Sequence, residues 1–166
     1  MQNSILRKVT RRRLRVQVTR CGFTLIEVLI VVVIMAILAA TIIPQFSSST
    51  KDAQTSTISF NVQTLRSQIE LYRSNHLTAY PAITNHSLPQ LVSTTDVNGN
   101  IGTGAAFTFG PYIAVIPSNP FNALATVGAV PTPGTAPTSG DGKYGYLYDV
   151  TTGNIYPDHI GWSGTL

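Results

Sequence analysis

One uninterrupted apolar run near the N-terminus constrains this chain more than any other feature. Residues 23–46 contain a single ionisable side chain, Glu27, in a stretch otherwise dominated by Leu, Ile, Val and Ala. About 20 residues of α-helix, rising about 1.5 Å each, cover the roughly 30 Å hydrocarbon core of a bilayer. The run is therefore long enough for a membrane-spanning helix, and a carboxylate inside such a helix is by default a functional residue.

The charges around the run predict an orientation. Seven of the 11 basic residues precede it, at positions 7–20, and no acidic residue does. By the positive-inside rule, this basic segment stays in the cytoplasm and the rest of the chain faces outward. A secretory signal peptide has a shorter apolar core of about 7–15 residues. A simple signal anchor, with Glu27 reaching toward the lipid headgroups, is the plainer alternative.

The junction before the run carries a recognisable motif. The string Gly22-Phe23-Thr24-Leu25-Ile26-Glu27, followed by the apolar residues, resembles the N-terminal signature of type IV pilins and of the pseudopilins of type II secretion. The resemblance implies that a prepilin peptidase cuts between Gly22 and Phe23 and that Phe23 becomes N-methylated. It also implies that Glu27 pairs with the terminal ammonium of a neighbouring subunit during assembly. Pro44 matches a proline common in these helices, where the missing N–H permits a kink.

Removal of residues 1–22 would change what the composition means. The remaining chain has four basic residues against seven acidic ones, a net charge of −3 instead of +4. The high isoelectric point then belongs to the leader, and it gives no reason to expect a nucleic-acid partner. The only cysteine, Cys21, also leaves with the leader, so we expect no disulfide.

The chain after the run divides by pattern into a helix and a loop-rich domain. Residues 47–76 continue the helix in amphipathic form and end it near 74–76. Their apolar side chains recur at spacings of three and four: Ile58, Val62, Leu65, Ile69 and Tyr72. Residues 77–166 hold nearly all of the Gly and Pro. The predicted fold class is α+β: a long N-terminal helix, with a transmembrane half and an amphipathic half, and a small C-terminal antiparallel β-sheet packed on it.

Within residues 77–166 the elements are short. We expect a short helix or turn over 88–92, a strand over 105–109 and an exposed Pro/Thr/Gly-rich loop over 130–140. The clearest strand signal is the alternation of Tyr144, Tyr146 and Tyr148 with smaller or polar residues. A turn over 150–153 would return the chain through 154–156 and form a hairpin.

Short motifs in this domain resemble the major pseudopilin branch of the family. They are Tyr80-Pro81, Leu88-Pro89-Gln90-Leu91, Gly110-Pro111-Tyr112-Ile113 and Ile116-Pro117-Ser118-Asn119-Pro120-Phe121. One position departs, because that branch usually has an aspartate where this chain has Asn119. The resemblance also implies calcium as a candidate cofactor, bound by carboxylates near the C-terminal strands. Asp141, Asp149 and Asp158 are the candidate ligands, although none aligns with the family's site.

The remaining chemistry-bearing residues do not form a catalytic arrangement. His76, His86 and His159 lack the spacing of metal ligands, and we expect the histidine at the helix end to be a solvated cap. Trp162 can cover the core or seat a partner, and we favour the core. Nothing in the sequence argues for an enzyme.

Three classes of function fit these patterns. The first is a type II secretion pseudopilin in the bacterial inner membrane, with a cytoplasmic N-terminus and a periplasmic domain. It would assemble with itself into a helical filament that drives protein export. Its other partners would be the prepilin peptidase and methyltransferase, an inner-membrane assembly platform and membrane lipid. The second is a type IV pilin for adhesion, motility or DNA uptake. The third is a membrane-anchored enzyme or binding module that does not polymerise. We favour the first.

Overall fold

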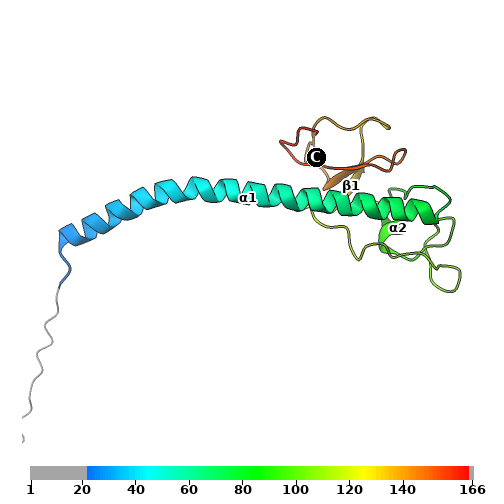
Figure 1. The fold of residues 1–166 in the computed structure, drawn as a ribbon, viewed down its shortest axis with the longest axis horizontal. Coiled ribbons are helices and arrows are strands. Elements are labelled where there is room, and N and C mark those ends of the chain that lie inside the picture. Colours follow the sequence, from blue (N-terminus) through cyan, green and yellow to red (C-terminus); the bar gives the residue numbers. More distant parts are fainter. Residues whose placement is uncertain (1–21, 165–166) are drawn as a thin grey trace, which may run out of the picture. The chain divides into compact units, whose positions relative to one another are not determined.

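The computed structural model describes residues 22–164, apart from the side chain of Pro44. The predicted leader over 1–22 therefore lies outside the described residues, with the exception of Gly22. The chain divides into two compact units, Met1–Pro44 and Gln45–Leu166. The secondary structure consists of helices α1 (Leu25–Asn75) and α2 (Pro89–Val92) and strands β1 (Val127–Ala129), β2 (Tyr146–Tyr148) and β3 (Ile155–Pro157) (Figure 1).

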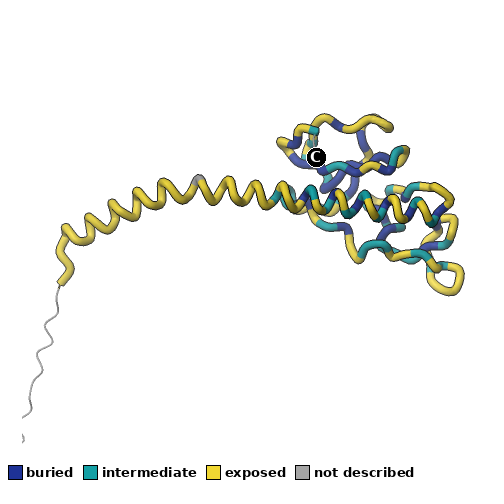
Figure 2. The backbone as a smooth tube through the Cα atoms, in the orientation of Figure 1, coloured by how far each residue is buried: buried dark blue, intermediate teal, exposed yellow. Residues whose placement is uncertain are grey.

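Helix α1 contributes to both units and has a different character in each. Over residues 25–43 every side chain is exposed, as the yellow tube in Figure 2 shows. Over the second part, the predicted stripe of Ile58, Val62, Leu65, Ile69 and Tyr72 is at most 1% exposed. The stripe packs with the buried residues of α2 and the strands into one hydrophobic core. The predicted α+β class, with a long N-terminal helix and a small sheet, is confirmed.

The C-terminus of α1 is closed by its own backbone. The helix ends at Asn75, within the predicted range. Beyond it the Thr78 N–H donates to the Arg73 carbonyl at 3.1 Å, while Leu77 and Thr78 adopt positive φ angles of 53° and 68°. This left-handed turn satisfies a carbonyl of the last helical turn, as in a Schellman motif.

The expectation that the histidine at this end is solvated is wrong. His76 is 1% exposed and stacks on Tyr72, with 3.8 Å between ring centroids. Its Nδ1 lies 2.7 Å from the Tyr72 carbonyl oxygen and its Nε2 lies 2.9 Å from Thr95 Oγ1. The Phe109 ring packs edge-on against it. The segment containing Thr95 and Phe109 therefore folds back over the helix end and excludes water.

The sheet has the order β1-β2-β3 and is mixed. Strands β2 and β3 form the predicted antiparallel hairpin, with Tyr148 opposite Ile155. Strands β1 and β2 pair in parallel, with Val127 opposite Tyr146. The prediction of a purely antiparallel sheet is wrong in this respect, because the long 130–145 connection carries the chain back to the starting end of the sheet. All three residues of β2 are buried, as expected for a central strand covered on both faces.

The predicted strand over 105–109 does not form. Of these residues, Phe109 makes an isolated bridge with Thr95, and Ala105 and Ala106 are exposed. The strand that pairs with β2 instead is β1, which the sequence pattern did not indicate. The short helix α2 and the hairpin lie where they were predicted, and Trp162 is 6% exposed, in agreement with a covering role.

Candidate functional site

The Gly22–Glu27 segment forms the start of α1. Gly22 and Phe23 precede the helix and are exposed, Phe23 by 85%. Helical hydrogen bonding begins with the Val28 N–H, which donates to the Thr24 carbonyl at 3.3 Å. The peptide bond between Gly22 and Phe23 therefore lies outside regular structure. Cleavage at this bond stays a prediction.

Glu27 is held by the residue that begins the helix. The Thr24 N–H and the Thr24 hydroxyl both donate to Glu27 Oε2, each at 2.8 Å, and the Glu27 N–H donates to Thr24 Oγ1 at 3.3 Å. This reciprocal arrangement is a capping box, in which the N-cap Thr and the Glu three positions later satisfy two orphan amides. Within residues 22–164, no hydrogen bond ends on Glu27 Oε1. One carboxylate oxygen thus remains available to a partner.

Thr24 was missed as a site residue, although the sequence carried a signal for it. Thr-x-x-Glu directly before an apolar run is the pattern of a capping box. The resemblance implies an assembly role for the glutamate and does not address its local role at the helix start.

The rest of the apolar segment has the surface of a membrane helix. Its side chains from Val28 to Ile43 are all exposed, and an 18-residue window of α1 has a mean hydropathy of 3.0 with none of the window buried. By length and composition α1 can cross a membrane. Pro44 lies within α1, at the boundary between the two units. The kink predicted there stays a prediction.

The three candidate calcium ligands do not form one cluster of free carboxylates. The Asp141 N–H donates to Asp158 Oδ1 at 2.8 Å, so these two residues are neighbours. Asp149 follows β2 and accepts hydrogen bonds from Gly134, Thr151 and Thr152. Among the residues that the structure describes, no group of three or more His, Cys, Asp or Glu side chains could hold a metal ion. The residues present do not fit a calcium cage of several free oxygen ligands.

Asn119, the residue that departs from the resembled branch, is fully buried and works as a donor. Its Nδ2 lies 2.9 Å from the Gly145 carbonyl oxygen and 3.4 Å from that of Asp158, and its Oδ1 accepts from the Phe121 N–H at 3.0 Å. An ionised aspartate could not donate to these carbonyls. The amide therefore suits its surroundings, where it joins three segments of the domain.

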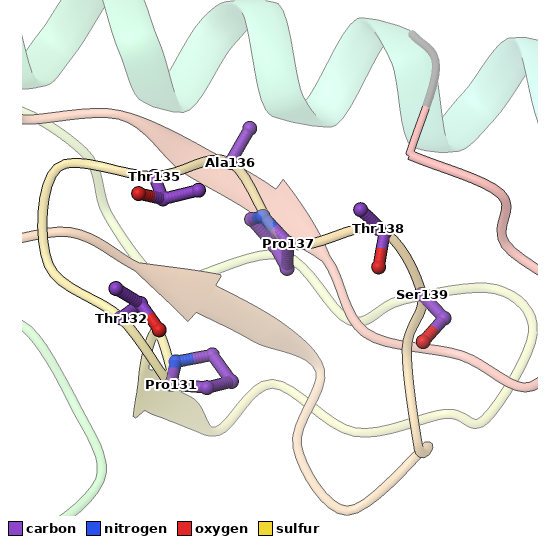
Figure 3. A pocket seen from close by; sticks show the side chains of 7 residues that line it. All are labelled: Pro131, Thr132, Thr135, Ala136, Pro137, Thr138 and Ser139. Atoms are coloured by element: carbon purple, nitrogen blue, oxygen red, sulfur yellow. The ribbon is translucent and has the colours of Figure 1, made fainter.

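The Pro-rich loop encloses a hollow without catalytic groups. Figure 3 shows the side chains around a cavity of about 240 Å³, lined by Pro131, Thr132, Thr135, Ala136, Pro137, Thr138 and Ser139. None of these side chains is an acid, a base or a strong metal ligand. The hydroxyl groups there have no base among the lining residues to activate them.

Comparison with known proteins agrees with the motif at the helix start. Residues 19–43 match the family model described as "Prokaryotic N-terminal methylation motif". The chain is also 37% identical over 71 residues to type II secretion system core protein G of Pseudomonas aeruginosa. That match covers 43% of this chain, and the chain spans about half of the relative's length, 49%.

No solved structure matches the chain. The matched methylation motif contains the Gly22-Phe23 junction and Glu27, and it continues through the exposed apolar part of α1. Together with the similarity to core protein G, the motif agrees with the resemblance of this chain to type IV pilins and type II secretion pseudopilins.

Proposed function

We propose that the chain is a structural subunit of a type II secretion pseudopilus. A prepilin peptidase would process it in the inner membrane, and it would then polymerise through α1 into a periplasmic filament that drives protein export. The observation that carries this proposal is a single carboxylate, Glu27, in an otherwise uncharged and fully exposed helical segment directly after the Gly22-Phe23 junction.

The exposed segment needs an apolar environment. An unbroken apolar helix of this length is stable in lipid or against other apolar helices, and not in water. A subunit that leaves the membrane can regain such surroundings by packing against copies of the same helix. One surface therefore serves both for storage in the membrane and for the core of a filament.

Glu27 would set the register between subunits. Cleavage after Gly22 would create an ammonium group on Phe23, and methylation preserves its positive charge. An ammonium and a carboxylate that are separately buried among apolar helices each carry a large desolvation cost, which pairing reduces. The Glu27 oxygen that accepts no hydrogen bond from Thr24 would accept this ammonium from a neighbouring copy.

The domain after the membrane segment would act as a folded periplasmic body and not as an enzyme. Its buried core is built on the second part of α1, and the cavity lined by residues 131–139 has no acid or base among its lining side chains. Its partners would be copies of itself, the peptidase and methyltransferase, the assembly platform and lipid.

The direct test is the intact mass and N-terminal sequence of the protein extracted from bacterial membranes. We expect a chain that begins at Phe23 with the mass of one added methyl group. A chain that still begins at Met1 in cells with an active prepilin peptidase would contradict the proposal.

Glu27→Ala separates polymerisation from folding and insertion. We expect this variant to insert in the membrane but to form no filaments and to lose export. Glu70→Ala is the matched control, because it removes an exposed acid from the same helix outside the apolar segment. Normal export by Glu27→Ala would overturn the assembly role. If the parent chain forms surface fibres and the loss of these fibres in Glu27→Ala has no effect on export, a type IV pilin is favoured instead.

A further inference from the structure

We infer that two buried carboxylates, Asp149 and Asp158, fasten the C-terminal part of the domain by accepting hydrogen bonds from the chain itself, and that the domain folds without a bound calcium ion. This inference does not depend on the proposed function. It concerns the 130–145 connection between β1 and β2.

Asp158, directly after β3, holds the segment that leads into β2. Its side chain is fully buried. Oδ1 accepts from the N–H groups of Asp141 at 2.8 Å and Gly142 at 2.9 Å, and Oδ2 accepts from the N–H of Tyr144 at 2.8 Å. Three backbone donors thus surround one carboxylate, as they would surround a bound anion.

The backbone of Asp158 extends the same junction. Its N–H donates to the Gly145 carbonyl at 3.1 Å, and its own carbonyl accepts from Asn122 Nδ2 at 2.7 Å. Asn122 Nδ2 also lies 2.7 Å from the Tyr144 carbonyl oxygen. The end of β3, the start of β2 and the 119–122 segment therefore meet at this one aspartate.

Asp149, directly after β2, holds the Pro-rich loop. It is 1% exposed. Oδ1 accepts from the N–H and the hydroxyl of Thr151, at 2.9 and 2.6 Å, and Oδ2 accepts from the Thr152 hydroxyl at 2.9 Å. Its fourth donor is the N–H of Gly134 at 2.7 Å, which lies in the loop. The same carboxylate thus shapes the β2–β3 turn and ties the loop to it.

These contacts leave little capacity for a cation. A carboxylate offers about four lone-pair sites, and Asp149 has four donors on it. The donors around Asp158 direct their hydrogens at the carboxylate, so a cation placed there would meet N–H groups where calcium needs oxygen atoms. Asp141 is exposed, and its Oδ1 accepts from the N–H of Lys143.

The two buried aspartates join chain segments in the way that a bound cation would join them. Calcium in a loop joins chain segments by sharing their oxygen atoms. Here the negative centre is the side chain, and the segments contribute N–H and O–H donors to it in charge-assisted hydrogen bonds. The two aspartates hold the connection at Gly134 and at residues 141–144, so both of its halves are fixed.

Thermal unfolding of the full-length protein in detergent micelles tests the inference. Trp162 is the only tryptophan of the chain, is buried and lies close to β3, with its ring centroid 6.1 Å from that of Tyr156, so its fluorescence reports on this region. We expect the same unfolding midpoint in excess EDTA and in excess calcium. A midpoint that calcium raises and EDTA lowers would overturn the inference.

Substitutions test the role of each carboxylate. Asp158→Asn and Asp149→Asn keep the size of the side chain but place an NH2 group among donors, so we expect each to lower the midpoint by roughly 4–8 °C or more, with no recovery in calcium. Asp141→Asn is the matched control and should leave the midpoint unchanged. If Asp158→Asn does not fold, Asp149→Asn and the calcium comparison on the unsubstituted chain still decide. An unchanged midpoint in both buried-aspartate variants would also overturn the inference.

Discussion

The carboxylate of Glu27 accepts two hydrogen bonds from Thr24, one from its main-chain N–H and one from its hydroxyl. The acid for which we propose contacts between copies of the chain is therefore bonded within its own chain. This bond pattern defines where α1 begins and occupies one oxygen of Glu27. The proposed contact would use the other oxygen, so the two roles do not exclude each other.

Thr24→Ala tests the helix start. Loss of the hydroxyl removes one of the two bonds to Glu27 and the acceptor of the Glu27 N–H. We expect faster hydrogen exchange of the amides in the first turn of α1 for the protein in micelles, measured by NMR, and a restored rate in Thr24→Ser. Thr41→Ala, which removes a hydroxyl bonded to the Ile37 carbonyl within the same segment, should leave the first turn unchanged. Equal exchange in Thr24→Ala and the parent chain would show that the cap does not hold α1.

The two faces of α1 in the second unit should respond differently to truncation. Leu65 is fully buried in the core, so Leu65→Ala should lower the free energy of unfolding by about 2–5 kcal/mol. Phe60 on the same helix is 69% exposed, and Phe60→Ala should change it by no more than about 0.5 kcal/mol in the unassembled protein. Urea unfolding measures both. A similar loss of unfolding free energy at the two positions would mean that the Phe60 ring is buried in the isolated chain.

The domain should lose stability in acid through Asp149. Burial raises the pKa of this carboxyl, but the hydrogen bonds from Thr151, Gly134 and Thr152 outweigh burial and lower the pKa to about 2. An aspartate in the unfolded chain has a pKa of about 3.9. Between these values the unfolded state binds more protons, so the stabilisation is complete above about pH 4 and is lost as the pH falls toward 2. The urea midpoint of unfolding should decrease as the pH falls through this range. The decrease should be less steep in Asp149→Asn.

The domain should also lose stability in alkali through its buried tyrosines. Burial raises the pKa of Tyr146 to about 12, and burial, with Tyr80 and Asp149 nearby, raises the pKa of Tyr148 further. Tyrosines of the unfolded chain ionise near about 10. Above that pH the unfolded state has released protons that the folded state retains. The stabilisation is therefore complete below about pH 10 and is lost as the pH rises toward 12.

Tyr148→Phe separates the ring from the hydroxyl. The Tyr148 hydroxyl is buried and has no hydrogen-bond partner among the described residues. Its removal should raise the free energy of unfolding at neutral pH by about 1 kcal/mol and weaken the alkaline loss. Tyr148→Leu, which also removes the ring, should destabilise the domain. A destabilised Tyr148→Phe would reveal a partner for the hydroxyl.

The features that the sequence predicts are those with a repeating pattern of side chains over neighbouring residues. The spacing of Ile58, Val62 and Leu65 indicated the buried face of α1, and the alternation of Tyr146 and Tyr148 indicated a strand of the hairpin. The motif around Gly22 and Glu27 is equally local, as is the capping box formed by Thr24 and Glu27.

The features that could not be predicted depend on partners far along the chain. Strand β1 spans three residues and has no alternation of its own; it exists because Val127 pairs with Tyr146. His76 is buried because the segment around Thr95 folds over it. Asp158 is held by backbone N–H groups, which every residue except proline possesses and which therefore leave no mark in the sequence.

The parallel pairing of β1 with β2 has a consequence for the order of folding. Strands β2 and β3 are joined by a turn of a few residues, whereas β1 meets β2 only after the 130–145 connection has closed. Contacts between neighbours in sequence form early and distant pairings form late, so the hairpin should precede the complete sheet. Since each doubling of a flexible loop costs only about 0.6 kcal/mol, the connection can lengthen at small thermodynamic cost provided that the Gly134 amide still reaches Asp149. This part of the surface is therefore free to vary in evolution while the core remains the same.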